Sequence, residues 1–87
     1  MYTVVFSRTA ANKLKKIDRL QAYRLLKRLQ KLSDEMPGAV LEPLKGDLKG
    51  SYKLRVGDYR VIFQVDWEQQ RIVVENIDHR SRIYKRR

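Results

Sequence analysis

The sequence predicts an α+β domain in the order β-α-α-β-β-β, a twisted antiparallel sheet with a helical hairpin on one face and a short basic C-terminal tail. Apolar residues recur at helical spacing before Pro37-Gly38, and after residue 51 they alternate with polar residues as strands do. The chain has 87 residues, which predicts a single domain over residues 1–87.

The N-terminal part predicts one strand followed by two helices. The strand, Tyr2 to Phe6, is short and rich in β-branched residues, which favour extended backbone. Ser7 or Thr9 is placed to cap the first helix and Asp18 to cap the second, because their side-chain oxygens accept hydrogen bonds from free N–H groups. The second helix carries one apolar stripe that predicts its core-facing side: Ala22, Leu25, Leu26, Leu29, Leu32 and Met36.

The C-terminal part predicts three consecutive strands after a loop at residues 39–50. Apolar and polar residues alternate from Tyr52 to Val56 and again from Tyr59 to Val65, as in strands with one buried face. Gly57-Asp58 between them is typical of a two-residue hairpin turn. A last strand is expected from Arg71 to Ile77.

The hairpin turn predicts which side chains share a face. Counting outward from it, Arg55 faces Arg60 and Lys53 faces Ile62. The opposite, apolar face should meet the helices, which leaves Lys53, Arg55 and Arg60 together on an open face of the sheet.

The composition points to a polyanionic partner. Lys and Arg number 20 against 10 Asp and Glu, which gives a net charge of +10 and a pI near 10.2. The tail, Asp78 to Arg87, holds five cations and one acid. The chain has no cysteine and one histidine, His79, so thiol chemistry is excluded and neither a metal site nor a cofactor is expected. No apolar run is long enough to span a membrane, so we expect a cytoplasmic protein.

The three cations expected on the open face carry the functional hypothesis. Directly opposed like charges destabilise a sheet by up to ~1 kcal/mol, so folding gains nothing from this arrangement. A bound phosphate would remove the repulsion and accept bidentate arginine contacts. The structural alternative is a solvated cationic face that keeps the sheet soluble.

Several segments resemble the RelE/ParE superfamily of bacterial and archaeal toxins. The most specific are Leu44-Lys-Gly, Tyr52-Lys-Leu-Arg-Val-Gly-Asp-Tyr-Arg, and His79-Arg together with Tyr84. The likeness extends over essentially the whole chain, since the early strand and helical hairpin fit in the same order.

The resemblance implies a RelE-like mRNA interferase, the toxin of a type II toxin–antitoxin system. Such a protein enters the ribosomal A site, where contacts with 16S rRNA are expected, and cuts the mRNA without metal. The ribose 2′-hydroxyl attacks the adjacent phosphate and leaves a 2′,3′-cyclic phosphate. A cognate RelB-like antitoxin is implied as the partner; we expect it to be acidic or amphipathic and to add a helix to the helical face.

The resemblance also assigns site residues. Lys53, flanked by cations, would take the 2′-hydroxyl proton, while Arg60 would clamp the scissile phosphate. Arg55 stands where the family has a second lysine, and it would stabilise charge without acting as a base. Arg80 would stabilise developing charge and Tyr84 would orient the nucleotide. Further RNA contacts are expected from flanking cations: Lys45, Lys49, Arg82 and Lys85.

Three alternatives stay open. Glu42-Pro-Leu-Lys resembles the glutamate segment of YoeB-like toxins, so Glu42 and His79 form a second candidate acid–base pair. A ParE-like toxin that inhibits DNA gyrase would share the fold without needing the cationic cluster. A basic RNA- or ribosome-binding module without catalysis would fit the charge equally well.

Overall fold

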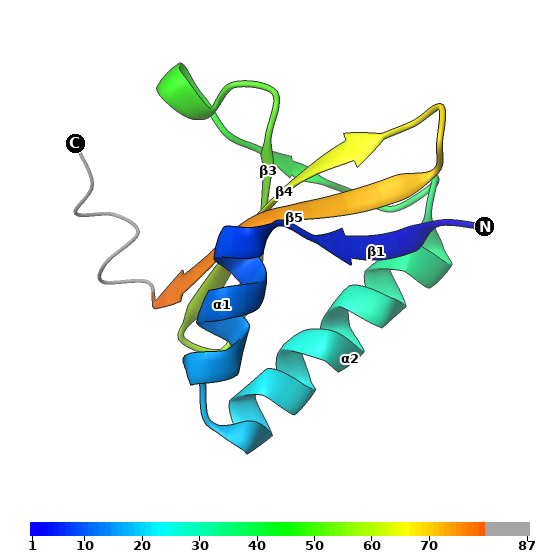
Figure 1. Cartoon of the computed structure of the whole chain (residues 1–87). Helices are drawn as coiled ribbons and strands as arrows, with labels where there is room; N and C mark the ends of the chain where they lie inside the picture. Colours follow the sequence, from blue (N-terminus) through cyan, green and yellow to red (C-terminus); the bar gives the residue numbers. More distant parts are fainter. Residues whose placement is uncertain (80–87) are drawn as a thin grey trace.

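The computed structural model describes residues 1–79, which form two α-helices and a five-stranded sheet (Figure 1). The elements run in the order β1 (Thr3–Phe6), α1 (Arg8–Lys16), α2 (Arg19–Glu35), β2 (Glu42–Pro43), a 3₁₀ turn (Gly46–Leu48), β3 (Tyr52–Val56), β4 (Tyr59–Asp66) and β5 (Arg71–His79). The α+β class and the position of the helical pair after the first strand are confirmed. No helix of this described part is long and apolar enough to cross a membrane.

The sheet has the strand order β1-β5-β4-β3-β2 and is mixed. The pairs β3–β4 and β4–β5 are antiparallel as expected, and β2–β3 is antiparallel as well, whereas β1 runs parallel to β5. The side-chain pattern of a short strand indicates which face is buried but carries no information on direction, so this pairing could not be predicted locally. The expected loop at residues 39–50 also contains β2, which extends the sheet beyond β3.

Both helices begin at the residues that the sequence indicated as caps. The Ser7 Oγ accepts a hydrogen bond from the Ala10 N–H at 3.0 Å, and the Asp18 Oδ1 accepts one from the Gln21 N–H at 3.0 Å. Each cap satisfies a backbone donor that has no partner inside the helix. α2 ends at Glu35, immediately before the Met36-Pro37 bond.

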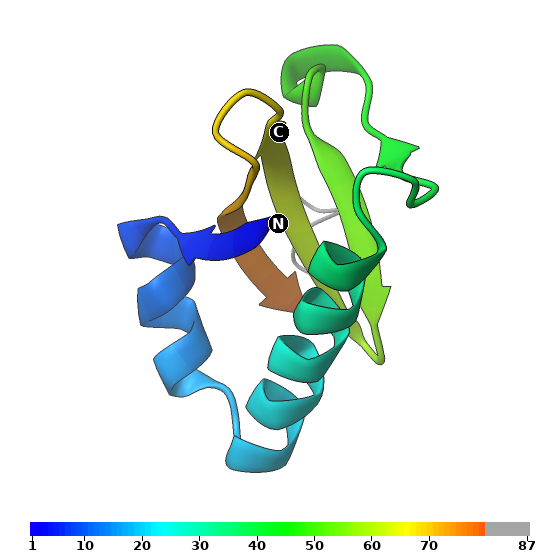
Figure 2. The ribbon, with the colours of Figure 1, turned by 90° about the vertical axis from the view of Figure 1, so that its right-hand side faces the viewer.

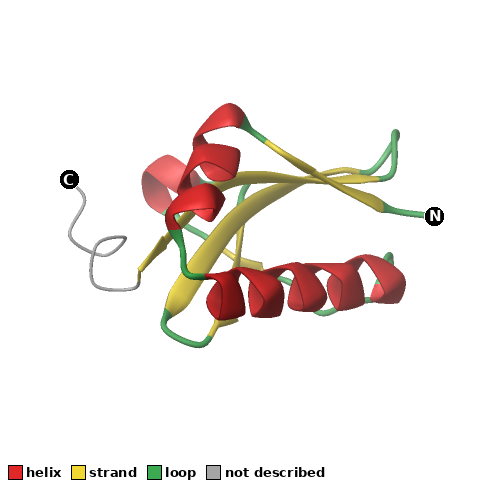
Figure 3. Cartoon of the chain, turned by 60° about the horizontal axis from the view of Figure 1, so that its bottom comes forward, coloured by secondary structure: helices red, strands yellow, loops and turns green. Residues whose placement is uncertain are grey.

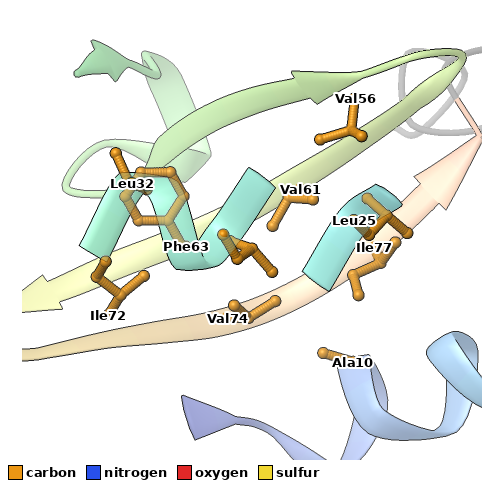
Figure 4. Close-up of a cluster of buried hydrophobic side chains, with 10 residues drawn as sticks. Ala10, Leu25, Leu32, Val56, Val61, Phe63, Ile72, Val74 and Ile77 are labelled. Carbon is orange, nitrogen blue, oxygen red and sulfur yellow. The ribbon is translucent and has the colours of Figure 1, made fainter. Parts of the chain in front are cut away.

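The core lies between the helices and one face of the sheet, with both helices contributing to it (Figure 3). Figure 4 shows side chains of α2 directed toward those of β4 and β5. The largest fully buried side chains are Leu25 and Leu29 from α2, Val61 and Phe63 from β4, and Ile72, Val74 and Ile77 from β5, and α1 contributes the buried Ala10. Tyr52, Leu54 and Val65 pack against this cluster, which confirms the predicted apolar face. Because this face of the sheet packs against the helices, side chains on the opposite face lie outside the core cluster.

α1 lies along the part of β5 that β1 does not reach (Figures 1 and 2). The β1–β5 pairing ends at Phe6 and Val74, where the Ser7 N–H donates to the Val74 carbonyl at 2.9 Å. The Ser7 Oγ then donates to the Glu75 carbonyl at 2.8 Å. Further along α1, the Lys13 Nζ lies 3.0 Å from the Asp78 Oδ2. These contacts fix the end of β5 against α1.

Candidate active site on the sheet face

The β3–β4 hairpin brings Lys53, Arg55 and Arg60 onto one side of the sheet, which we call the basic sheet face. The register is the one predicted: Arg55 is the Cα partner of Arg60, and Lys53 is the partner of Ile62. Gly57 sits in the turn with a φ of 60°, a conformation that glycine adopts without steric cost. The local turn therefore sets the positions of the three cations.

The expectation of an open cationic face is wrong for two of the three residues. Arg55 is exposed, but Arg60 is only 6% exposed and the side chain of Lys53 only 13%. The Arg60 Nη1 donates to the Tyr59 carbonyl at 3.4 Å. The alternation of strand residues assigns a side chain to a face, but it does not say what else packs there. A buried guanidinium is held in a narrower range of orientations than a solvated one.

A carboxylate lies beside Lys53 on this face. Glu42 on β2 is the Cα partner of Lys53, and its Oε2 lies 3.4 Å from the Lys53 Nζ. Asp78 on β5 is the Cα partner of Arg60, but its carboxylate pairs with Lys13 of α1. The inference that folding gains nothing from these cations is therefore wrong for Lys53, which gains an ion pair with Glu42. The sequence did not show this because the pairings of β2 and of the end of β5 are long-range.

A β-bulge adds one acidic residue that the sequence reading missed. The β4–β5 register shifts between Ile62 and Phe63, which leaves Glu75 as the extra residue on β5. The Glu75 Oε1 accepts a hydrogen bond from the Ser51 Oγ at 2.8 Å, across the intervening strand. Ser51 is buried, so this bond is shielded from water. The glutamate that directly follows the apolar run Ile72-Val-Val was the feature of the sequence that could have indicated this residue.

Glu42 and His79 are not brought together. β3 and β4 lie between their strands. The His79 ring packs edge-on against the Tyr59 ring, with centroids 5.6 Å apart and an interplanar angle of 82°. Tyr59 belongs to the side of the hairpin that packs on the core, whereas Glu42 pairs with Lys53 on the other side. His79 therefore faces the α1 side of the strand end.

The remaining expected residues fall into two groups. Lys45 and Lys49 flank the 3₁₀ turn between β2 and β3, and both are exposed. Arg80, Arg82, Tyr84 and Lys85 lie outside the described residues. Within residues 1–79, no group of three or more His, Asp or Glu side chains is arranged to hold a metal ion.

The basic sheet face has the chemical groups that phosphodiester cleavage requires. Two arginines and a lysine supply positive charge for a phosphate whose negative charge increases in the transition state. Glu42 supplies a carboxylate acceptor beside Lys53. A 2′-hydroxyl nucleophile needs such an acceptor for its proton.

Comparisons with known proteins identify the family of the chain. The family model described as the ParE toxin of the type II toxin–antitoxin system parDE matches residues 4–84. Toxin RelG of Mycobacterium tuberculosis is 37% identical over 86 residues, which cover 98% of each chain.

Solved structures show the same fold. The toxin–antitoxin complex RelBE2 of M. tuberculosis contains a chain that superposes with a TM-score of 0.79 at 32% identity, covering 91% of this chain and 98% of that one. The isolated E. coli RelE toxin gives a TM-score of 0.77 at 25% identity, covering 97% of this chain and 92% of that one. The chain therefore belongs to the RelE/ParE superfamily and is a toxin of the type II toxin–antitoxin class.

Proposed function

We propose that this toxin is a metal-independent endoribonuclease that cleaves mRNA on the ribosome. The observation that carries the proposal is the grouping of Lys53, Arg55 and Arg60 on one face with a carboxylate beside the lysine. The relatives named RelG and RelE support the proposal, because mRNA cleavage is the activity that resemblance to the RelE branch implies.

The geometry favours a specific division of roles. Arg60, held by burial in the sheet, would bind the non-bridging oxygens of the scissile phosphate. Lys53 would act as an ammonium that stabilises the transition state, because its Nζ is 3.4 Å from the Glu42 carboxylate. Glu42 would then accept the 2′-hydroxyl proton as the 2′-oxygen attacks phosphorus, and the 5′-oxygen of the next nucleotide would leave with the electron pair of the broken P–O bond and take a proton from water. This reverses our first assignment, in which Lys53 is the base.

The decisive experiment is primer extension on mRNA incubated with translating ribosomes and purified toxin. Wild-type protein is expected to give discrete cleavage stops, and Arg60→Ala to reduce the rate by about 10²–10³-fold, the usual cost of one preorganised charge-stabilising donor. Arg71→Ala is the matched control, since Arg71 is an exposed arginine at the far end of the same sheet. Because Arg60 is buried, circular dichroism and a melting curve establish that each variant is folded. Intact mRNA with wild-type toxin would refute the proposal.

A second candidate function rests on the family model. Its description names ParE, and a ParE-like toxin would inhibit DNA gyrase without phosphodiester chemistry. A supercoiling assay separates the two functions. If the toxin inhibits gyrase and Arg60→Ala inhibits it equally, the ParE-like function is supported. A basic binding module without catalysis would instead bind ribosomes with a steep salt dependence and cut nothing.

We further propose that a RelB-like antitoxin binds the outer face of α2. Leu20, Tyr23 and Leu26 are large apolar residues exposed along this helix, with Lys27 close to the Tyr23 ring. The solved neighbours from M. tuberculosis and E. coli include toxin–antitoxin complexes. An amphipathic acidic helix would cover the apolar residues and pair with the cations. Tyr23→Glu is expected to weaken capture of a co-expressed antitoxin, and unchanged capture would contradict this site.

A further inference from the structure

A pocket of about 580 Å³ lies between the end of α1 and the end of β5. Lys13 and Lys16 line it from α1, while Tyr59 and His79 line it from β4 and β5. Nothing in the roles assigned to the basic sheet face uses it. It opens on the α1 side of the sheet, and Asp78, the Cα partner of Arg60, connects it to the basic sheet face.

The lining of the pocket has three chemically distinct parts. Ile17 and Ile77 form an apolar part. The rings of Tyr59 and His79, which meet at 82°, form an aromatic part. Lys13 and Lys16 form a cationic part on one face of α1, since residues three apart in a helix are neighbours.

This combination fits a nucleotide. A base is flat and largely apolar on its faces, so it can stack on aromatic or aliphatic side chains. A phosphate carried on the same molecule would reach the lysines at the rim, as Lys16 is exposed and Lys13 partly so. An acidic peptide would pair with the lysines, but its carboxylates offer no flat ring to stack on the Tyr59 and His79 rings.

The ion pair between Lys13 and Asp78 shapes this pocket. Asp78 also lines it, and its Oδ2 lies 3.0 Å from the Lys13 Nζ. This ion pair holds the Lys13 side chain toward the end of β5. Lys16 takes no part in the pair. Lys16 is therefore the better placed of the two to contact a phosphate.

We propose that this pocket is a nucleotide-binding subsite on the α1 side of the sheet, separate from the phosphate position at Arg60. The identity of the ligand as part of an mRNA rests on the proposed function. The affinity for a single nucleotide does not, because it depends only on the lining described above.

His79 makes the test direct, because it is the single histidine of the chain and gives one set of imidazole signals in a proton NMR spectrum. AMP, GMP, CMP and UMP are titrated separately at fixed pH and ionic strength, and adenosine and inorganic phosphate are titrated as the two halves of AMP. We expect at least one nucleotide to shift the His79 signals saturably, with each half binding more weakly than the whole.

Two lysine variants make the result specific. Lys16→Gln is expected to weaken nucleotide binding about two- to fivefold, the range of an exposed ion pair. Lys15→Gln removes the same charge from the neighbouring exposed position, which does not line the pocket, and should leave the affinity unchanged. Equal weakening by both variants would show that only the net charge of α1 attracts the nucleotide, and would overturn the subsite.

The outcomes separate this inference from the proposed function. His79 signals that no nucleotide moves would overturn the subsite, whether or not the toxin cuts mRNA. Signals that move only with an acidic antitoxin peptide would also overturn it and would assign the pocket to protein binding. Saturable nucleotide binding by a toxin that leaves mRNA intact would support the subsite and refute the nuclease.

Discussion

Arg55 and Arg60 lie directly opposite each other across the β3–β4 hairpin, so two guanidinium groups share one rung of the sheet. Neighbouring strands are about 4.8 Å apart, and like charges at this separation repel. On the far side Arg60 has Asp78 as its cross-strand partner, whereas Arg55 is on the exposed strand position next to the turn. Arg55 is thus the cation whose place is hardest to explain by folding.

Arg55→Gln should separate stability from activity. Removing the repulsion is expected to raise the free energy of unfolding by about 0.2–1 kcal/mol. Loss of a charge-stabilising cation is expected to slow ribosomal mRNA cleavage by about 10- to 100-fold. Urea unfolding and primer extension measure the two effects. Arg71→Gln is the control, because Arg71 faces Asp66 and its removal should bring neither a gain in stability nor a loss of cleavage.

The Glu42–Lys53 pair gives a test of which residue takes the proton. If Lys53 stabilises the transition state by its positive charge, Lys53→Arg keeps most of the cleavage rate, because arginine stays protonated. Glu42→Gln keeps the shape of the side chain but removes the acceptor, and it should slow cleavage by about 10²-fold or more. Single-turnover cleavage on ribosomes compares them, with Glu68→Gln in the exposed β4–β5 turn as control. If Lys53→Arg is inactive and Glu42→Gln keeps its activity, the lysine and not the glutamate is the base.

The turn at Gly57 is expected to be sensitive to substitution. Its φ of 60° is unfavourable for a residue with a Cβ, while the space around it is open enough for one, since the nearest atom is 3.7 Å away. Gly57→Ala should therefore lower the free energy of unfolding by about 1–2 kcal/mol through backbone strain alone. Gly57→Asn should cost less, because asparagine tolerates this conformation better. Equal losses for the two variants in urea unfolding would contradict this cause.

The Lys13–Asp78 ion pair should contribute little to global stability. The Lys13 side chain is about one-third exposed, so solvent and salt screen the interaction. A double-mutant cycle of Lys13→Gln and Asp78→Asn is expected to give a coupling energy below about 1 kcal/mol, which decreases as salt is added. A larger, salt-independent coupling would mean that the pair acts as a buried one.

The residues predicted most accurately are those whose partners are close in sequence. Ser7 and Asp18 cap their helices within three residues, and Gly57-Asp58 fixes the register of Arg55 against Arg60 across one tight turn. Helical spacing in α2 and alternation in β3 and β4 likewise selected most of the buried side chains, although Leu26, expected on the core-facing side of α2, is 44% exposed. In each case the determining interaction lies within one element or one hairpin.

The sequence by itself thus determined the fold class, the helix starts, the hairpin register and the shared face of Lys53, Arg55 and Arg60. Only the tertiary structure placed Glu42 beside Lys53, turned Glu75 toward Ser51, set β1 parallel to β5 and buried Arg60. These features join segments that are distant in the chain. Their geometry follows from closing the sheet and filling a common core, and no local pattern of residue types encodes which distant strand will fit.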